Sequence, residues 1–216
     1  MSGLTLGGIR FYADELRDLA IAWVVLGAAF SVFFFRSTGR PVFPNIADVI
    51  SSPAFGRLFV VSMLTVGVGF LLHELAHKVV AVRFGQVAAF RADYPMLALC
   101  LGAALAGFLF AAPGAVHHRG RITARENGLV SVAGPLTNVA LVAVFVPLYF
   151  LDGFLGDVGQ LGIIINAVLA AFNMIPFGPL DGRKVLGWSK VVFAVVFLGT
   201  ALLAVGSFLA VGFPSF

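Results

Sequence analysis

The sequence predicts an all-α polytopic membrane protein with five or six transmembrane helices. Its 216 residues are 60% hydrophobic and only 11% charged, whereas soluble chains are about 45–50% apolar and about 25% charged. The mean hydropathy is +1.04, and apolar runs recur from residue 19 almost to the C-terminus. This composition leaves too little polar surface to cover a soluble domain. We therefore expect a single membrane domain over residues 1–216, embedded in the lipid bilayer.

Six apolar segments are candidates for transmembrane helices, because a helix needs about 20 mostly apolar residues to cross a bilayer. These segments lie at residues 19–35, 57–82, 96–112, 128–151, 158–176 and 191–211. Segments rich in proline, glycine or charge separate them and predict loops. The run at 96–112 is short, rich in alanine and glycine, and followed by Pro113. It either crosses the bilayer or dips in and returns as a re-entrant element covered by other helices.

The basic residues are explained by membrane topology rather than by a nucleic-acid partner. The formal net charge is +4, but the lysines and arginines fall mostly between the apolar runs. The chain has no Lys/Arg-rich run and no basic stripe interleaved with aromatic residues, so we assign no nucleic-acid role. Its single cysteine, Cys100, lies inside an apolar run and excludes an internal disulfide framework.

The strongest chemical signal is a His-Glu-Leu-Ala-His motif at residues 73–77, inside an apolar run. Positions i and i+4 of a helix lie on one face, so the imidazoles of His73 and His77 can reach one zinc ion at about 2.0–2.1 Å. Glu74 lies beside them, where its carboxylate can take a proton from a metal-bound water. Ionisable side chains in a spanning helix are costly, and a proton relay does not require this spacing. The motif therefore favours a zinc site over a relay.

A third ligand is needed, because a catalytic zinc usually has three protein ligands and one open position. Asp181 follows an apolar helix, in the segment Asn173-Met-Ile-Pro176-Phe-Gly-Pro179-Leu-Asp181-Gly182. The prolines interrupt the helix, and unwound backbone is tolerated inside a membrane only where protein or a cavity covers it. An Asp-Gly turn at a helix end would also explain this carboxylate, but its pairing with the histidine helix favours a metal ligand.

His117 and His118 compete with Asp181 as candidate ligands. Adjacent residues point apart on regular structure, and both histidines lie in an arginine-rich segment. Solvation at the membrane interface is therefore favoured over metal binding for this pair.

The combination of these motifs resembles the site-2 protease family of intramembrane zinc metalloproteases, of the archaeal and bacterial type without a PDZ domain. The segment Ala133-Gly134-Pro135-Leu136-Thr137-Asn138 resembles the stretch that opens the next core helix in that family. The resemblance covers a catalytic core of roughly residues 57–185. It implies a short β-like membrane-edge element after the zinc-motif helix, where this chain has the longer and more apolar run 96–112.

The resemblance also implies the site residues of a metalloendopeptidase. His73, His77 and Asp181 would hold one Zn²⁺ per chain, and Glu74 would be the general base that activates a zinc-bound water. Asn173 would help to hold the substrate strand.

The expected substrate is a transmembrane protein, whose helix must unwind locally because its backbone amides are hidden in internal hydrogen bonds. Extension along an edge strand near residues 84–95 would achieve this by strand addition. Asn173 or Asn138 would hold that strand or stabilise the oxyanion. For Asn138, an interhelical hydrogen bond is an equal alternative.

Both halves of the predicted site lie near the C-terminal ends of their helices, so they meet at one depth only if those helices run parallel. An odd number of crossings must then separate them, which favours 128–151 as a crossing and 96–112 as re-entrant or half-inserted. This arrangement gathers most of the basic residues on one side, among them Arg10, Arg83 and Arg119. The positive-inside rule then predicts a multi-pass cell-membrane protein with its active site toward the cytoplasm.

Two other classes of protein could carry the His-Glu-Leu-Ala-His motif. A transporter or channel would line an ion path with the intramembrane histidines and glutamate. This class of protein is expected to have further ionisable residues along the path and internal repeats, and the sequence shows neither. A catalytically inactive metal-binding relative would have no use for a base at Glu74.

Overall fold

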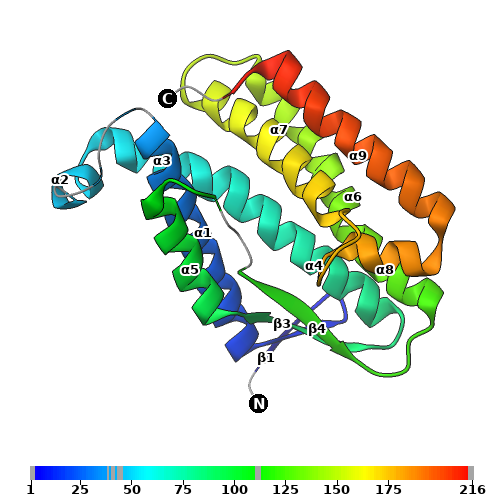
Figure 1. Cartoon of the computed structure of the whole chain (residues 1–216). Helices are drawn as coiled ribbons and strands as arrows, with labels where there is room; N and C mark the ends of the chain where they lie inside the picture. Colours follow the sequence, from blue (N-terminus) through cyan, green and yellow to red (C-terminus); the bar gives the residue numbers. More distant parts are fainter. Residues whose placement is uncertain (1–2, 38, 40–41, 43–45, 110–112, 214–216) are drawn as a thin grey trace.

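Five long apolar helices form the framework of the computed structural model, which describes residues 3–37, 39, 42, 46–109 and 113–213 (Figure 1). Each of the five is long and apolar enough to cross a membrane. They are α1 (Ala13–Ser37), the continuous helix Pro53–Arg83, α6 (Ala124–Tyr149), α7 (Phe154–Asn173) and α9 (Lys190–Val211). The predicted all-α polytopic fold is confirmed.

The helix that carries the His-Glu-Leu-Ala-His motif contains a π-helical turn. It consists of α3 (Pro53–Ser62), the π turn η1 (Met63–Gly67) and α4 (Val68–Arg83). The indole Nε1 of Trp23 in α1 donates a hydrogen bond to the Met63 carbonyl at 2.9 Å. Gly67 leaves room for the same indole, because a Cβ there would overlap the Trp23 ring. Helix α1 is thereby fixed against the motif helix just before the motif begins.

The run at 96–112 does not form a spanning helix. Helix α5 instead covers Tyr94–Ala106, with the Asp93 carboxylate accepting from the Met96 N–H at 3.0 Å at its start. The helix ends at Gly107, whose φ is +92°. Its 13 residues are about 20 Å long, shorter than the hydrocarbon core of about 30 Å. Residues 110–112 of the predicted run lie outside the described residues, and insertion of α5 into the bilayer stays a prediction.

Helix α6 is consequently the one long helix between α4 and α7 in the described part of the chain. One helix long enough to cross a membrane agrees with the odd number that the sequence required for the two halves of the site to meet. The helix starts with a capping box, in which Thr123 and Glu126 satisfy each other's backbone N–H groups.

Two short antiparallel hairpins complete the fold. Strands β1 (Gly3–Leu6) and β2 (Ile9–Tyr12) are joined through Gly7 and Gly8, which both have positive φ. Strand β3 (Val87–Ala92) pairs with β4 (Gly114–Arg119), so that Phe90 lies opposite Val116. The short β element expected after the motif helix is present as β3.

Helix α4 lies at the centre of the molecule, with α6 and α7 on one side and α1 and the β3–β4 hairpin on the other (Figure 1). Phe70 of α4 packs edge-to-face on Phe90 of β3, with ring centroids 5.7 Å apart. Two short helices connect long ones along the chain: α2 (Ile46–Ile50) lies between α1 and α3, and α8 (Asp181–Trp188) lies between α7 and α9. Helix α9 packs on α7 and α8 along one face, and apolar side chains on its other face, such as Val191, Leu202 and Leu209, are exposed.

Candidate metal centre

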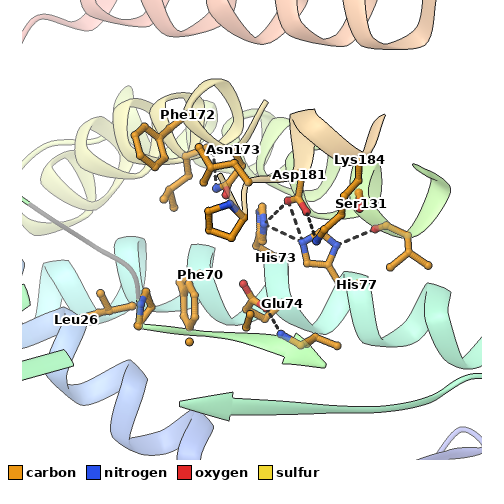
Figure 2. Close-up of a pocket in the computed structure, with 18 of the residues that line it drawn as sticks. Leu26, Phe70, His73, Glu74, His77, Ser131, Phe172, Asn173, Asp181 and Lys184 are labelled. Carbon is orange, nitrogen blue, oxygen red and sulfur yellow. Dashed lines mark hydrogen bonds and ion pairs between the residues drawn. The ribbon is translucent and has the colours of Figure 1, made fainter. Parts of the chain in front are cut away.

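Three buried metal-binding side chains meet between α4 and the start of α8. His73 and His77 project from one face of α4, and Asp181 is the first residue of α8 (Figure 2). The two Nε2 atoms are 3.0 Å apart. Oδ2 of Asp181 lies 3.3 Å from Nε2 of His73 and 3.1 Å from Nε2 of His77. The structure thus joins the two distant sequence motifs in one group that can hold a metal ion.

Hydrogen bonds on the far side of each imidazole fix which nitrogen faces the group. Nδ1 of His73 donates to Oδ1 of Asn138 at 2.6 Å, and Nδ1 of His77 donates to the Val130 carbonyl at 2.7 Å. The Asn138 amide is itself oriented, because its Nδ2 donates to Oδ1 of Asn166 at 2.9 Å. With Nδ1 carrying the proton, each neutral imidazole presents a lone pair at Nε2.

This donor set fits one zinc ion. Two imidazole nitrogens and a carboxylate oxygen face one another at 3.0 to 3.3 Å, an arrangement that is repulsive unless a cation or a proton lies between them. A tetrahedral zinc with ligand bonds of about 2.0–2.2 Å places its ligand atoms about 3.3 Å apart. Three protein ligands leave the fourth position open, as catalytic zinc sites do.

Asp181 reaches the imidazoles because the chain unwinds between α7 and α8. Gly182 permits the close approach, since a Cβ there would overlap the Met174 carbonyl at the end of α7. Burial raises the pKa of the Asp181 carboxyl, but the interactions with His77 and His73 outweigh burial and bring the pKa below its ordinary value. The ionised carboxylate is the form that binds a metal.

Helix α6 passes close to both imidazoles at Gly134. A Cβ at this position would lie 2.5 Å from Nε2 of His73 and 2.6 Å from Cε1 of His77. The Ala133-Gly134-Pro135 stretch therefore has a physical role, because glycine leaves the room that the metal-binding group occupies.

Glu74 is buried beside the metal-binding group and forms a hydrogen bond with strand β4. Its Oε2 accepts a hydrogen bond from the Val116 N–H at 2.9 Å. A cavity of about 180 Å³ opens at these side chains (Figure 2). Apolar residues of α1 and α7 form part of its wall, namely Leu26, Phe30, Leu169 and Phe172. Metal ligands, a carboxylate and an apolar wall thus face one space.

The two predicted asparagines have different places. Asn173 lines the cavity, and its Nδ2 donates to the Leu169 carbonyl of its own helix at 2.9 Å. Asn138 is fully buried, and both ends of its amide are engaged within the protein. Of the two alternatives for Asn138, the interhelical hydrogen bond is the one present. The expected substrate contact does not fit this residue, because its amide orients the His73 ring instead.

His117 and His118 lie on β4 and do not belong to the metal-binding group formed by the described residues. His117 is exposed, whereas His118 lines one edge of the cavity. Partial burial and the nearby charge of Lys184 lower the pKa of His118.

The strand edge at the cavity belongs to β4, whereas the predicted edge strand near residues 84–95 is present as β3, which does not line this cavity. Strand β3 pairs with β4 on one side. On its other side, the N–H groups of Phe90 and Ala92 donate to the carboxylates of Glu15 and Asp18. The residues of β4 that line the cavity include Gly114, Val116 and His118.

Sequence reasoning missed several groups that build this site. The Val116 N–H and the Val130 carbonyl are backbone groups, which every residue type supplies, so no sequence signal marks them. Asn166 did carry a signal, because a buried amide in a spanning helix needs a partner.

The fold and the site together define a protein with several helices apolar enough to span a membrane and a buried His-His-Asp group that can hold one zinc ion. The chain is 45% identical over 192 residues to "Putative zinc metalloprotease MJ0611" of Methanocaldococcus jannaschii, covering 87% of this chain and 91% of that protein. It is 32% identical over 145 residues to "Putative zinc metalloprotease YwhC" of Bacillus subtilis, covering 57% of this chain and 66% of that protein. No family model and no solved structure matches the chain. The chain belongs to the zinc metalloprotease family that these two relatives represent.

Proposed function

We propose that this protein is an intramembrane metalloendopeptidase of the site-2 protease type, which hydrolyses peptide bonds in transmembrane or membrane-proximal segments of other proteins. One observation carries the proposal. Glu74 and two of the three metal-binding residues, His73 and His77, lie within a 31-residue helix that is long and apolar enough to span a membrane. A protease that acted only on soluble substrates would have no need to bury these costly groups in such a helix.

His73, His77 and Asp181 would hold the zinc ion, which when bound would supply Lewis-acid polarisation of a carbonyl and a water of lowered pKa, toward about 7. Glu74 acts as the general base, taking a proton from the attacking water on its carboxylate and passing that proton to the leaving amine. The Val116 N–H holds one oxygen of this carboxylate at 2.9 Å, which orients the other oxygen. Asn138 and the Val130 carbonyl hold the two imidazoles in the tautomer that binds metal.

The substrate segment binds in an extended form along β4, because its backbone must be freed from helical hydrogen bonds before attack. The outer edge of β4 faces the cavity. Its Val116 N–H is held by Glu74, so the substrate strand pairs with the neighbouring backbone groups of this edge, and such pairing gives affinity without a fixed sequence. The apolar wall from α1 and α7 suits the side chains of a transmembrane segment. Asn173, at the cavity rim, contacts this strand.

The site faces the cytoplasm of the cell. Arg83, Arg91 and Arg119 lie at the end of the molecule formed by the β3–β4 hairpin and the end of α4. The positive-inside rule places such an end on the cytoplasmic side.

The test is cleavage of a transmembrane peptide by purified protein in detergent micelles or liposomes, with zinc per chain measured in parallel. Glu74→Gln should keep about one zinc per chain and lose about 10²–10⁴-fold in kcat, the usual contribution of a general base. His77→Ala and Asp181→Ala should lose both zinc and cleavage.

Glu126→Gln is the matched control, because it makes the same change in a capping residue on α6, and glutamine also serves in a capping box. Its cleavage rate should equal that of the parent. Equal rates for Glu74→Gln and the parent, or no cleavage by a zinc-loaded parent, would contradict the proposal and favour a structural zinc site.

A further inference from the structure

Three buried ionisable residues outside the metal centre take no part in the proposed reaction. They are Glu15, Asp18 and Lys78, with relative exposures of 0%, 3% and 0%. Nζ of Lys78 donates to Oε1 of Glu15 at 2.6 Å and to the Arg10 carbonyl at 2.8 Å. Burying two ions costs several kcal/mol each, and such a pair is often no more stabilising than apolar residues of the same volume. A contribution to the stability of the fold therefore does not by itself explain why this ion pair is buried.

The two carboxylates lie along the back edge of strand β3. Oε1 of Glu15 accepts from the Phe90 N–H at 3.0 Å, and Oδ2 of Asp18 accepts from the Ala92 N–H at 3.2 Å. Residues i and i+2 of a strand point to the same edge, and residues i and i+3 of a helix lie on one face. The carboxylates of Glu15 and Asp18, in the first turns of α1, therefore bind two successive N–H groups on the same edge of β3.

The opposite edge of the same hairpin meets the metal centre. Val116 is the register partner of Phe90, and its N–H points the other way, to Glu74. Glu74 and Lys78 are four residues apart, on one face of α4. Polar contacts therefore tie both edges of the hairpin to α4, one from Val116 to Glu74 and the other from Phe90 through Glu15 to Lys78, and the pairing of β3 with β4 joins the two.

We propose that Glu15 and Asp18 are positioning residues that hold the β3–β4 hairpin from behind and so fix the outer edge of β4 beside the metal ligands. Lys78 neutralises Glu15 and ties it to the same helix that carries His73 and His77. The carboxylates also occupy the back edge of β3, which leaves β4 as the edge for strand addition. The consequence for the substrate rests on the proposed function, whereas the positioning itself does not.

The experiment compares two double variants that remove the same pair of charges. Glu15→Gln with Lys78→Met keeps a carbonyl oxygen for the Phe90 N–H, and Glu15→Leu with Lys78→Met removes it at similar side-chain volume. Amide hydrogen exchange at Val116, which does not touch residue 15, is the main measurement. We expect roughly tenfold or faster exchange at Val116 in the leucine variant than in the glutamine variant, with exchange in α7 unchanged.

Zinc per chain should equal that of the parent in both variants, because no metal ligand is changed. With a transmembrane peptide, KM should rise in the leucine variant more than kcat falls. Equal Val116 exchange in the two variants would overturn the proposal. Exchange that accelerates equally in α7 would also overturn it, because Glu15 would then support only global stability.

A second pair keeps the proposal testable if the leucine variant does not fold. Asp18→Asn retains an acceptor for the Ala92 N–H, and Asp18→Leu does not. The leucine form should loosen the hairpin amides selectively. A parent that cleaves no peptide but shows this exchange pattern would remove the proposed function and leave the positioning role standing.

Discussion

Replacement of Gly134 by alanine should weaken zinc binding while leaving the helical fold intact. The added Cβ would lie 2.5 Å from Nε2 of His73 and 2.6 Å from Cε1 of His77, far inside the usual separation of about 3.5–4.0 Å. Neither imidazole can turn away without breaking its hydrogen bond to Asn138 or Val130. Disturbing the groups that orient metal ligands typically costs 10–100-fold in affinity. We expect a loss of roughly 10–100-fold or more in zinc affinity.

The metal-free fold should change little. Alanine is favoured over glycine inside a helix by about 0.5–1 kcal/mol, which offsets part of an overpacking cost of about 1–3 kcal/mol. The net loss of unfolding free energy is then at most about 2.5 kcal/mol.

Zinc affinity is measured by competition with a chromophoric chelator in detergent, and helicity by circular dichroism. Gly199→Ala in α9 is the matched control, since a Cβ there meets nothing within 4 Å, and it should bind zinc as the parent does. Parental zinc affinity in Gly134→Ala would refute the argument, because α6 could not then lie against the two imidazoles.

Four further outcomes are expected. Asn138→Leu removes the acceptor for Nδ1 of His73 and should lower zinc affinity roughly 10–100-fold in the same chelator competition; an unchanged affinity would show that this bond does not orient the ring. Thr123→Ala breaks the capping box of α6 and should cost about 1 kcal/mol of unfolding free energy, read from denaturant titration, with zinc per chain unchanged. Trp23→Phe removes the donor to the Met63 carbonyl in the π turn and should cost about 0.5–1.5 kcal/mol in the same titration; parental stability would contradict that role. Zinc at about 100 times its Kd should stabilise the fold by about 2.7 kcal/mol over the chelator-treated protein, visible as a fall in Tm on chelation.

The long helices could be predicted because each bilayer crossing needs its own apolar run. The first and last residues of these helices were harder to predict, because polar groups outside the apolar runs determine where each helix begins. Helix α1 begins at Ala13, upstream of the predicted 19–35, since its first turns are acidic and bind partners on other elements. Helix α6 begins at Ala124 rather than 128 because the capping box adds a polar first turn.

The metal ligands were within reach of sequence reasoning for two different reasons. The spacing of His73 and His77 dictates a shared face on any helix. Asp181 was found through the interrupted helix before it and the resemblance to a family, since only tertiary structure brings it to the histidines. Tertiary structure also decides the role of Asn138, which depends on which atom faces His73.

The strand that lines the cavity was not predicted, because strand pairing across an intervening helix leaves no local signal. Residues 84–95 do contain an edge strand, but its partner β4 lies on the far side of α5 in the sequence and is the strand that lines the cavity. Only the carboxylates of Glu15 and Asp18, bonded to β3, reveal which edge is closed.

The π turn at Met63–Gly67 divides the motif helix into two α-helical parts. The residues after the turn are displaced by one position from the α-helical repeat of the residues before it. A π turn holds about one residue more than the α-helical turn it replaces, and each residue advances a helix by about 100°. If all the residues of this turn were kept but adopted a regular α-helix, the face of His73 and His77 would rotate by about 100°, more than a quarter turn, away from Asp181, whereas deleting one residue would leave that face in place. A design that transfers the motif to another membrane helix must therefore keep the number of residues between the π turn and His73. It must also include Trp23, whose indole binds the π turn.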